Sequence, residues 1–173
     1  PFAEKMFVAY KELEGIAKNK ISKIIEIGNI IRQEILDYNI SSIKDSTKLN
    51  ILILGGSQAA KVFAEELPDI FKKCINAKIK IKIFQQCLLN QKTFLETFYK
   101  KMGIEYEIFN FSKNVTKYFS KANLVITRAG SSMLSELINT KTPFISVPLP
   151  SSADNHQLKN AIFYSNKRYG YLI

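Results

Sequence analysis

The residues of this chain with the clearest chemical potential lie between Asn123 and Leu137, in the stretch NLVITRAGSSMLSEL. A short apolar run ends in a glycine-containing turn, and the helix expected after it begins with Ser131 and Ser132. Helix-start N–H groups have no partner within the helix, so at the end of a strand they bind phosphate without any special side chain. Glu136 follows about one turn later, where a carboxylate can accept hydrogen bonds from sugar hydroxyls. The pattern predicts a site for a nucleotide that carries a sugar.

A second turn of this kind, Gly55-Gly56-Ser57-Gln58-Ala59-Ala60, follows the aliphatic run 51–54. Its glycines let the backbone approach a diphosphate closely, and Ser57 can donate a hydrogen bond to it. The turn is not a G-x-G-x-x-G fingerprint and lacks the lysine of a P-loop. Purely structural roles therefore stay open for both stretches. Ser57 can be the N-cap of the helix that follows this turn, and Ser135 with Glu136 can be a capping arrangement in the stretch 123–137.

Amide side chains follow a third turn, in the stretch PLPSSADNHQLKNA at 148–161. Its Asp-Asn pair suits a helix start, and Gln157 and Asn160 then fall on one face of that helix. Amides both donate and accept, so this pair suits sugar hydroxyls, although an ordinary capped helix explains it equally well. His156 has no evident Ser, Cys or carboxylate partner, which favours a structural or ligand-positioning role over that of a general base.

Two further residues have both a structural and a ligand-binding interpretation. Phe111 follows a predicted strand and precedes a loop, so it belongs either to the core or against the ring of a base. Arg32 lies shortly after Gly28-Asn29, where it is either a surface residue or a cover for the ligand from the N-terminal block.

The formal net charge of +10 and the pI of about 9.5 leave three interpretations. These are nucleic-acid binding, an anionic membrane surface, and a basic surface that is simply solvated. The lysines are scattered, and no RNA- or DNA-binding motif accompanies them, so we expect no nucleic-acid partner. Membrane association through charge is more plausible, because each basic residue near anionic lipid contributes about 1 kcal/mol.

Other features narrow the class of protein. No apolar run approaches the ~20 residues that a membrane span needs, and the N-terminus lacks the pattern of a signal peptide. The two isolated cysteines fit small buried side chains in a reducing cytoplasm. With a single histidine, we expect neither a metal site nor a cofactor. Because the chain begins with proline and ends in a strand-like GYLI, we expect it to be a piece of a longer protein.

Residues 1–40 form a separate block, with strands expected at 6–10 and 24–27 and a helix at 30–38, and a polar linker follows at 41–48. From residue 49 strands alternate with helices, which predicts an α/β fold with a parallel sheet covered by helices on both faces. We expect strands at 51–54, 79–84, 105–109, 124–127 and 144–147, and helices at 59–67 (ending at Pro68), 93–102, 115–121, 133–139 and 155–165. The glycine- and serine-rich turns all fall at the carboxyl edge of that sheet, where ligands bind in such folds.

Four blocks together resemble the MurG family of bacterial glycosyltransferases in order and spacing, over nearly the whole chain. They are GNIIR at 28–32, GGSQAA at 55–60, RAGSSMLSE at 128–136 and PLPSSADNHQLKNA at 148–161. Members of this family transfer N-acetylglucosamine from UDP-N-acetylglucosamine to lipid I and thereby form lipid II. The resemblance implies a GT-B fold, of which 49–173 is the Rossmann-like donor-binding domain and 1–40 is the end of the N-terminal domain with the connector. It also implies an inverting, metal-independent reaction at the cytoplasmic face of the inner membrane.

The resemblance also implies a role for each matching residue. Arg32 approaches the uracil or phosphate side of the donor, Ser57 contacts the diphosphate, and Phe111 and the backbone of Ser112 bind the uracil. Ser131, Ser132 and Met133 offer N–H groups to phosphate and sugar, Glu136 holds the ribose, and Gln157 and Asn160 bind the N-acetylglucosamine hydroxyls.

The chain departs from the family pattern at Ile30, where proline is usual, at Ala60, where glycine is common, and over Ser131-Ser132-Met133. The N-terminal glycine-rich loop and its histidine have no counterpart here, so the catalytic residues are expected in an N-terminal domain outside this chain. Two other hypotheses stay open: a donor-binding subunit of a split GT-B enzyme, and a catalytically silent module that binds nucleotide sugars.

Overall fold

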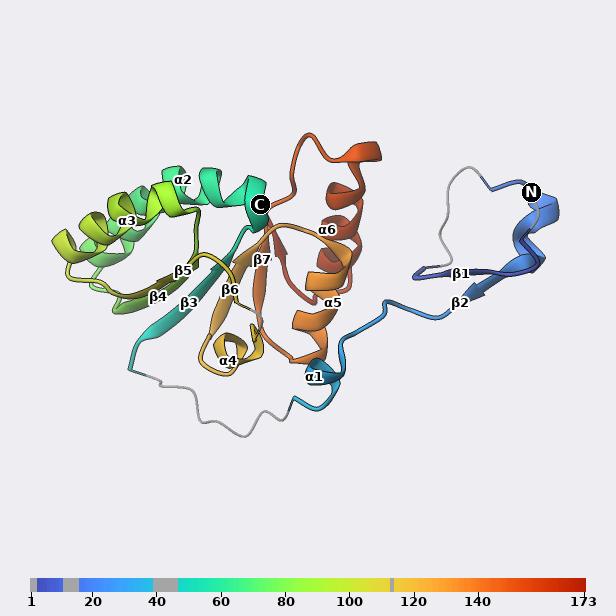
Figure 1. The fold of residues 1–173 in the computed structure, drawn as a ribbon, viewed down its shortest axis with the longest axis horizontal. Helices are drawn as coiled ribbons and strands as arrows, with labels where there is room; N and C mark the ends of the chain where they lie inside the picture. Colours follow the sequence, from blue (N-terminus) through green and yellow to red (C-terminus); the bar gives the residue numbers. More distant parts are fainter. Residues whose placement is uncertain (1–2, 11–15, 39–46, 113) are drawn as a thin grey trace.

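The computed structural model describes residues 3–10, 16–38, 47–112 and 114–173. Its centre is a six-stranded parallel sheet with the strand order β5-β4-β3-β6-β7-β8 (Figure 1). The strands are β3 (Leu49–Leu54), β4 (Ile81–Gln86), β5 (Glu105–Phe109), β6 (Leu124–Thr127), β7 (Phe144–Ser146) and β8 (Tyr171–Leu172). The chain order reverses between β3 and β6, which makes this pair the topological switch point of a doubly wound sheet.

Helices cover both faces of the sheet, as expected (Figure 1). The helices α2 (Gly56–Asn76) and α3 (Leu89–Lys101) lie on one face, and α4 (Thr116–Phe119), α5 (Ser131–Asn139) and α6 (His156–Asn166) lie on the other. The alternation of strand side chains explains both layers. Ile51 and Ile53 pack in the core under α2 and α3, whereas Leu52 and Leu54 pack in the core under α4, α5 and α6.

Helix α2 corrects one expectation, because it does not end at Pro68 but continues to Asn76. Proline inside a helix removes a hydrogen bond and costs about 3 kcal/mol. Buried Phe63 and Leu67 before Pro68 and buried Phe71 after it hold the helix against the sheet on both sides of this position. Tertiary packing therefore overrides the local signal.

The N-terminal block contains a two-stranded unit that stands apart from the sheet, beyond α5 and α6, and a short helix that lies against α5 (Figure 1). Strands β1 (Met6–Val8) and β2 (Ile24–Glu26) pair in parallel, and a 3-10 helix at Lys18–Lys23 precedes β2. The expected helix at 30–38 shortens to α1 (Gln33–Leu36), whose Ile35 is 2% exposed and packs into the core beneath α5 and α6. Most of the predicted linker at 41–48, up to residue 46, lies outside the described residues.

A close approach near the C-terminus makes one glycine structurally necessary. A Cβ atom at Gly170 would lie 2.2 Å from the ring of Phe144, which is buried at the start of β7. This contact lets the chain enter β8 beside β7, where Ile145 pairs with Tyr171.

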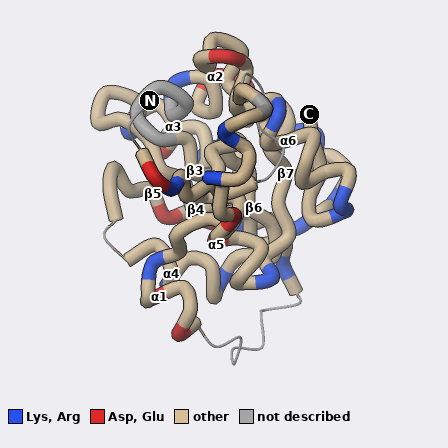
Figure 2. Tube along the Cα trace, turned by 90° about the vertical axis from the view of Figure 1, so that its right-hand side faces the viewer, with Lys and Arg blue, Asp and Glu red and all other residues tan. Residues whose placement is uncertain are grey.

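Lysine and arginine positions are distributed over several elements along the chain trace (Figure 2). Within the described ranges, no helix has both the length and the apolar composition that crossing a bilayer requires.

A short 3-10 turn at Ala153–Asn155 precedes α6 and completes the described elements.

Candidate functional site

The two predicted phosphate-compatible turns lie side by side. Leu54, the last residue of β3, pairs with Thr127, the last residue of β6. The turn that begins at Gly55 and the turn that begins at Arg128 therefore leave adjacent strands at the same sheet edge. This edge is the carboxyl end of the switch point, where open α/β sheets bind their ligands.

A cavity of about 380 Å³ opens at this point, which is within the size range of small-molecule sites. Its wall combines strand ends, both turns, the loop after β5 and the connector. The lining residues are Arg32, Leu54, Gly55, Gln86, Phe109, Phe111, Ser112, Val115, Thr127, Arg128, Gly130, Met133 and Gln157.

Five of the predicted site residues line this cavity: Arg32, Phe111, Ser112, Met133 and Gln157. Phe111 is 72% exposed, so its ring is a free apolar surface at the cavity and not part of the core. Its exposure removes the core interpretation that the sequence left open. Gln157 is held in place, because its Oε1 accepts a hydrogen bond from the backbone N–H of Leu149 at 3.0 Å.

Helix α5 begins at the cavity with Gly130 as its N-cap residue and no side-chain cap. The N–H groups of Ser131, Ser132 and Met133 form its first turn, where an α-helix offers donors without intrahelical partners. Helix α2 begins in the same way after Gly55. Ser57 lies in the first turn of α2, and its side chain lies outside the part of the chain that the structure describes.

Glu136 does not line the cavity, but both of its carboxylate oxygens accept hydrogen bonds from Arg32, which does. Arg32 Nε donates to Glu136 Oε1 at 2.8 Å, and Arg32 Nη2 donates to Glu136 Oε2 at 2.7 Å. These hydrogen bonds are the main reason why the pKa of Arg32 is raised, and burial opposes them. The Glu136 side chain is 8% exposed and that of Arg32 is 45% exposed, so a partly accessible cation covers a buried carboxylate.

A second set of contacts holds the connector to helices α5 and α6. Asn29 Nδ2 donates to Ser135 Oγ at 2.6 Å and to the Tyr10 hydroxyl at 2.9 Å. Asn29 Oδ1 accepts from Ser131 Oγ at 2.6 Å. The hydroxyls of Tyr10 and Tyr164 are 2.6 Å apart, and desolvation raises the pKa of Tyr164 to about 12. Residues 29–32 therefore dock along the first two turns of α5.

Comparison with known proteins identifies the domain around this cavity. The glycosyltransferase family 28 C-terminal domain matches residues 50–173. The chain belongs to this family.

Relatives with 34% and 36% identity are both named UDP-N-acetylglucosamine–N-acetylmuramyl-(pentapeptide) pyrophosphoryl-undecaprenol N-acetylglucosamine transferase. The first, from Rickettsia canadensis, is matched over 99% of this chain and 49% of its own length. The second, from Pelagibacter ubique, is matched over 99% and 48%. The crystal structure of Acinetobacter baumannii MurG superposes with a TM-score of 0.77 and 25% identity, over 99% of this chain and 47% of that one. The chain thus spans about half the length of the proteins it matches, and the resemblance to the MurG family is confirmed.

Arg128 is a residue of the family 28 domain to which the sequence analysis assigned no role. Its Nη1 donates to the backbone carbonyls of Val147 and Pro148 at 3.1 and 3.0 Å, and its guanidinium lies 5.2 Å from the centre of the Phe63 ring. Burial lowers its pKa. Arg128 therefore holds the loop after β7 at the cavity. Its position directly after β6 is the sequence feature that could have indicated a role at the site.

Asn160 reinforces the same connection and does not line the cavity. Its Nδ2 donates to the carbonyl of Ala129 at 3.0 Å, so the start of α6 and the 128–130 turn hold each other. The sequence analysis also assigned no role to Asn29 and Gln86. Gln86 lies at the carboxyl end of β4 and lines the cavity. The alternation of isoleucine and lysine predicted this strand at 79–84, two residues too early.

His156 is exposed, and its Nδ1 lies 2.7 Å from the carbonyl oxygen of Ala153. This contact at the start of α6 supports the structural role over that of a base. Among the described residues, no group of three or more His, Cys, Asp or Glu side chains is arranged to hold a metal ion.

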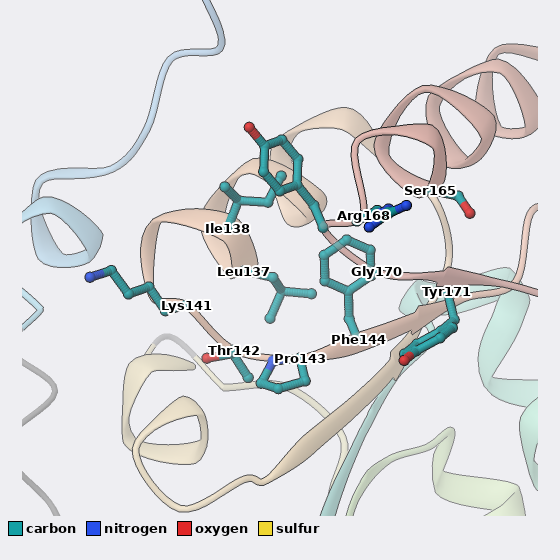
Figure 3. A pocket seen from close by; sticks show the side chains of 11 residues that line it. Leu137, Ile138, Lys141, Thr142, Pro143, Phe144, Ser165, Arg168, Gly170 and Tyr171 are labelled. Carbon is teal, nitrogen blue, oxygen red and sulfur yellow. The ribbon is translucent and has the colours of Figure 1, made fainter.

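A larger cavity, of about 680 Å³, lies at the opposite edge of the sheet (Figure 3). The end of α5, the start of β7 and the start of β8 form it, and Leu137, Pro143 and Phe144 contribute apolar side chains. Ligands of parallel sheets bind at the carboxyl ends of the strands, whereas this cavity lies at their amino ends. None of the predicted site residues lines it, so size alone does not make it the functional site.

Proposed function

We propose that this chain is the donor-binding half of an enzyme that transfers N-acetylglucosamine from UDP-N-acetylglucosamine to lipid I, forming lipid II. The names of its relatives and the MurG structure support this reaction. In the same proposal, residues 1–40 are the end of the acceptor domain with the connector, 41–48 are a linker, and 49–173 are the donor domain.

The observation that carries the proposal is the pair of helix starts at the switch point. Helices α2 and α5 both begin where β3 and β6 end, and the cavity opens between them. Helix N-termini carry partial positive charge and favour anions. A diphosphate placed there is stabilised as it departs with additional negative charge, which is electrostatic catalysis.

The remaining roles in this proposal are those that the family resemblance implies. The exposed ring of Phe111 stacks on uracil, and the backbone of Ser112 contacts the edge of the base. Ser57 and the first turn of α5, with Ser131, Ser132 and Met133, bind the phosphates and sugar, and Arg32 approaches the diphosphate. Glu136 binds the ribose hydroxyls, and Gln157 and Asn160 lie toward the N-acetylglucosamine.

The acceptor proposed here is lipid-linked, so the enzyme works at a membrane surface, namely the cytoplasmic face of the bacterial inner membrane. The net charge of +10 supports attraction to anionic lipid there. The catalytic base and the acceptor site are assigned to the part of the longer relatives that this chain does not span.

Isothermal titration calorimetry of the folded chain with UDP-N-acetylglucosamine, UDP and GDP-mannose tests the proposal. We expect saturable binding of the first two, competition between them, and no binding of GDP-mannose. A transfer assay with a lipid I analogue should give no product with this chain alone. Absence of binding by UDP-N-acetylglucosamine to a protein with a cooperative thermal transition would contradict the proposal.

A further inference from the structure

The ion pair between Arg32 and Glu136 has a consequence for which ligands the cavity accepts. We propose that Arg32 makes the site selective for nucleoside diphosphates over nucleosides. The inference rests on the proposed function, in which Glu136 binds the ribose, and it extends that function to the residue that determines specificity.

The first step is access to the carboxylate. Arg32 lines the cavity and Glu136 does not, while both carboxylate oxygens accept hydrogen bonds from the guanidinium. The Glu136 side chain is 8% exposed, so little of it can be reached by any other route. A ribose that binds Glu136 therefore competes with Arg32 for the carboxylate oxygens.

The second step is the mobility of Arg32. Arg32 is the residue immediately before α1, and its side chain is 45% exposed. Within the described ranges its other ionic neighbour is Glu34, at 4.0 Å, which is 68% exposed and belongs to the same chain segment. Side-chain rotation is therefore enough to release Glu136, and the backbone of the connector stays docked through Asn29.

The third step is the balance of charge. Moving Arg32 away is costly, because the buried carboxylate of Glu136 is then left without a compensating charge. The ribose hydroxyls of any nucleoside can donate to Glu136 and replace part of what it loses. Only a ligand with phosphates also gives Arg32 a new anionic partner, and guanidinium binds phosphate oxygens well.

The two ligand classes therefore respond oppositely to the loss of Arg32. A nucleoside must break the ion pair and gives Arg32 no anionic partner in return, so Arg32 weakens its binding. A nucleoside diphosphate exchanges one ion pair for another, so Arg32 strengthens its binding. Charge-assisted hydrogen bonds contribute about 1.5–3 kcal/mol, which corresponds to roughly tenfold or more in affinity.

The test measures uridine and UDP affinities by calorimetry for the wild type, Arg32→Ala, Arg32→Lys and Glu136→Gln. For Arg32→Ala we expect uridine to bind roughly tenfold more tightly and UDP roughly tenfold more weakly. Arg32→Lys loses the forked geometry and keeps the charge, so uridine should again bind more tightly while UDP stays near the wild-type value. Glu136→Gln should weaken both ligands, because the ribose loses its carboxylate.

Arg168→Ala is the matched control, because Arg168 is exposed and lines the cavity at the opposite edge of the sheet. It should change neither affinity. Equal weakening of uridine and UDP by both Arg32 variants, or unchanged uridine binding in both, would overturn the inference and leave UDP binding by the chain in place. Failure of the folded wild type to bind UDP would overturn the proposed function and the inference with it.

Discussion

Asn29 and Ser135 are 106 positions apart in the chain, yet Asn29 Nδ2 lies 2.6 Å from Ser135 Oγ. The same side chain accepts a hydrogen bond from Ser131, so one asparagine of the connector bonds to two successive turns of α5. Ser131 stands in the first turn of that helix, at the cavity. The connector is thus part of the structure that positions the candidate donor site.

Replacing Asn29 tests this connection. Asn29→Ala removes the hydrogen bonds of the amide to buried Ser135, to Ser131 and to Tyr10, and we expect it to lower the free energy of unfolding by about 1–3 kcal/mol. Asn76→Ala, at the exposed end of α2, is the control and should stay within about 0.5 kcal/mol of the wild type. Urea unfolding measures both, and equal stability of the two variants would show that the contact does not hold the connector.

Alkaline pH should weaken the cluster around Tyr164. Burial raises its pKa from 10.0 to about 12, so the folded state favours the neutral phenol. This contribution is complete below pH 10 and is lost as pH rises toward 12, because only the unfolded chain ionises readily in that range. Its size is at most about 2–3 kcal/mol. Burial also raises the pKa of Tyr99, which acts in the same direction.

The measurement is the free energy of unfolding between pH 8 and pH 11.5, for the wild type and Tyr164→Phe. The variant should be less stable near pH 8, since it loses the hydrogen bond to Tyr10, and the difference should shrink above pH 10. A difference that stays constant across this range would contradict the role of Tyr164.

Phe111 should contribute to ligand affinity and not to stability. Its ring is 72% exposed, so Phe111→Ala should leave the unfolding transition nearly unchanged. Base stacking on an aromatic ring contributes about 1–3 kcal/mol, so UDP binding should weaken by roughly 5- to 100-fold. Phe94→Ala, at an exposed position of α3, is the control, and calorimetry with UDP should show no effect of it. Comparable UDP affinities of Phe111→Ala and the wild type would exclude stacking.

Gly170 should tolerate no side chain. Gly170→Ala places a methyl group 2.2 Å from the Phe144 ring, and such overpacking costs about 1–3 kcal/mol. Gly130→Ala is the steric control, because nothing lies within 4 Å of its Cβ position and its φ of −68° suits alanine. Thermal unfolding should show a lower midpoint for Gly170→Ala only. A normal midpoint would mean that β8 shifts away from Phe144 at little cost.

The sequence was sufficient to predict the sheet, because strand alternation and helix starts are local signals. The strands at 105–109 and 124–127 have the predicted boundaries, and the two turns share one edge because their strands neighbour each other. Helix α2 differed, since the buried contacts that carry it past Pro68 come from residues distant in sequence.

The candidate site was only partly predictable for the same reason. Residues adjacent to glycine-rich turns, such as Met133 and Gln157, were found from local spacing and do line the cavity. The partnership of Arg32 with Glu136 and the contacts of Asn29 join segments more than 100 positions apart. These residues lie in two blocks that the sequence singles out, but no local pattern pairs one block with the other, so only the folded chain reveals the contacts.

The central claim is that a UDP moiety binds where β3 and β6 end. Backbone amide spectra of the ¹⁵N-labelled 19.7 kDa chain during a UDP titration test it directly. We expect saturable shifts at the amides of Gly55, Phe111 and Ser131, and no shifts at those of Lys141 and Arg168. Shifts concentrated at Lys141 and Arg168, or none that saturate, would contradict it.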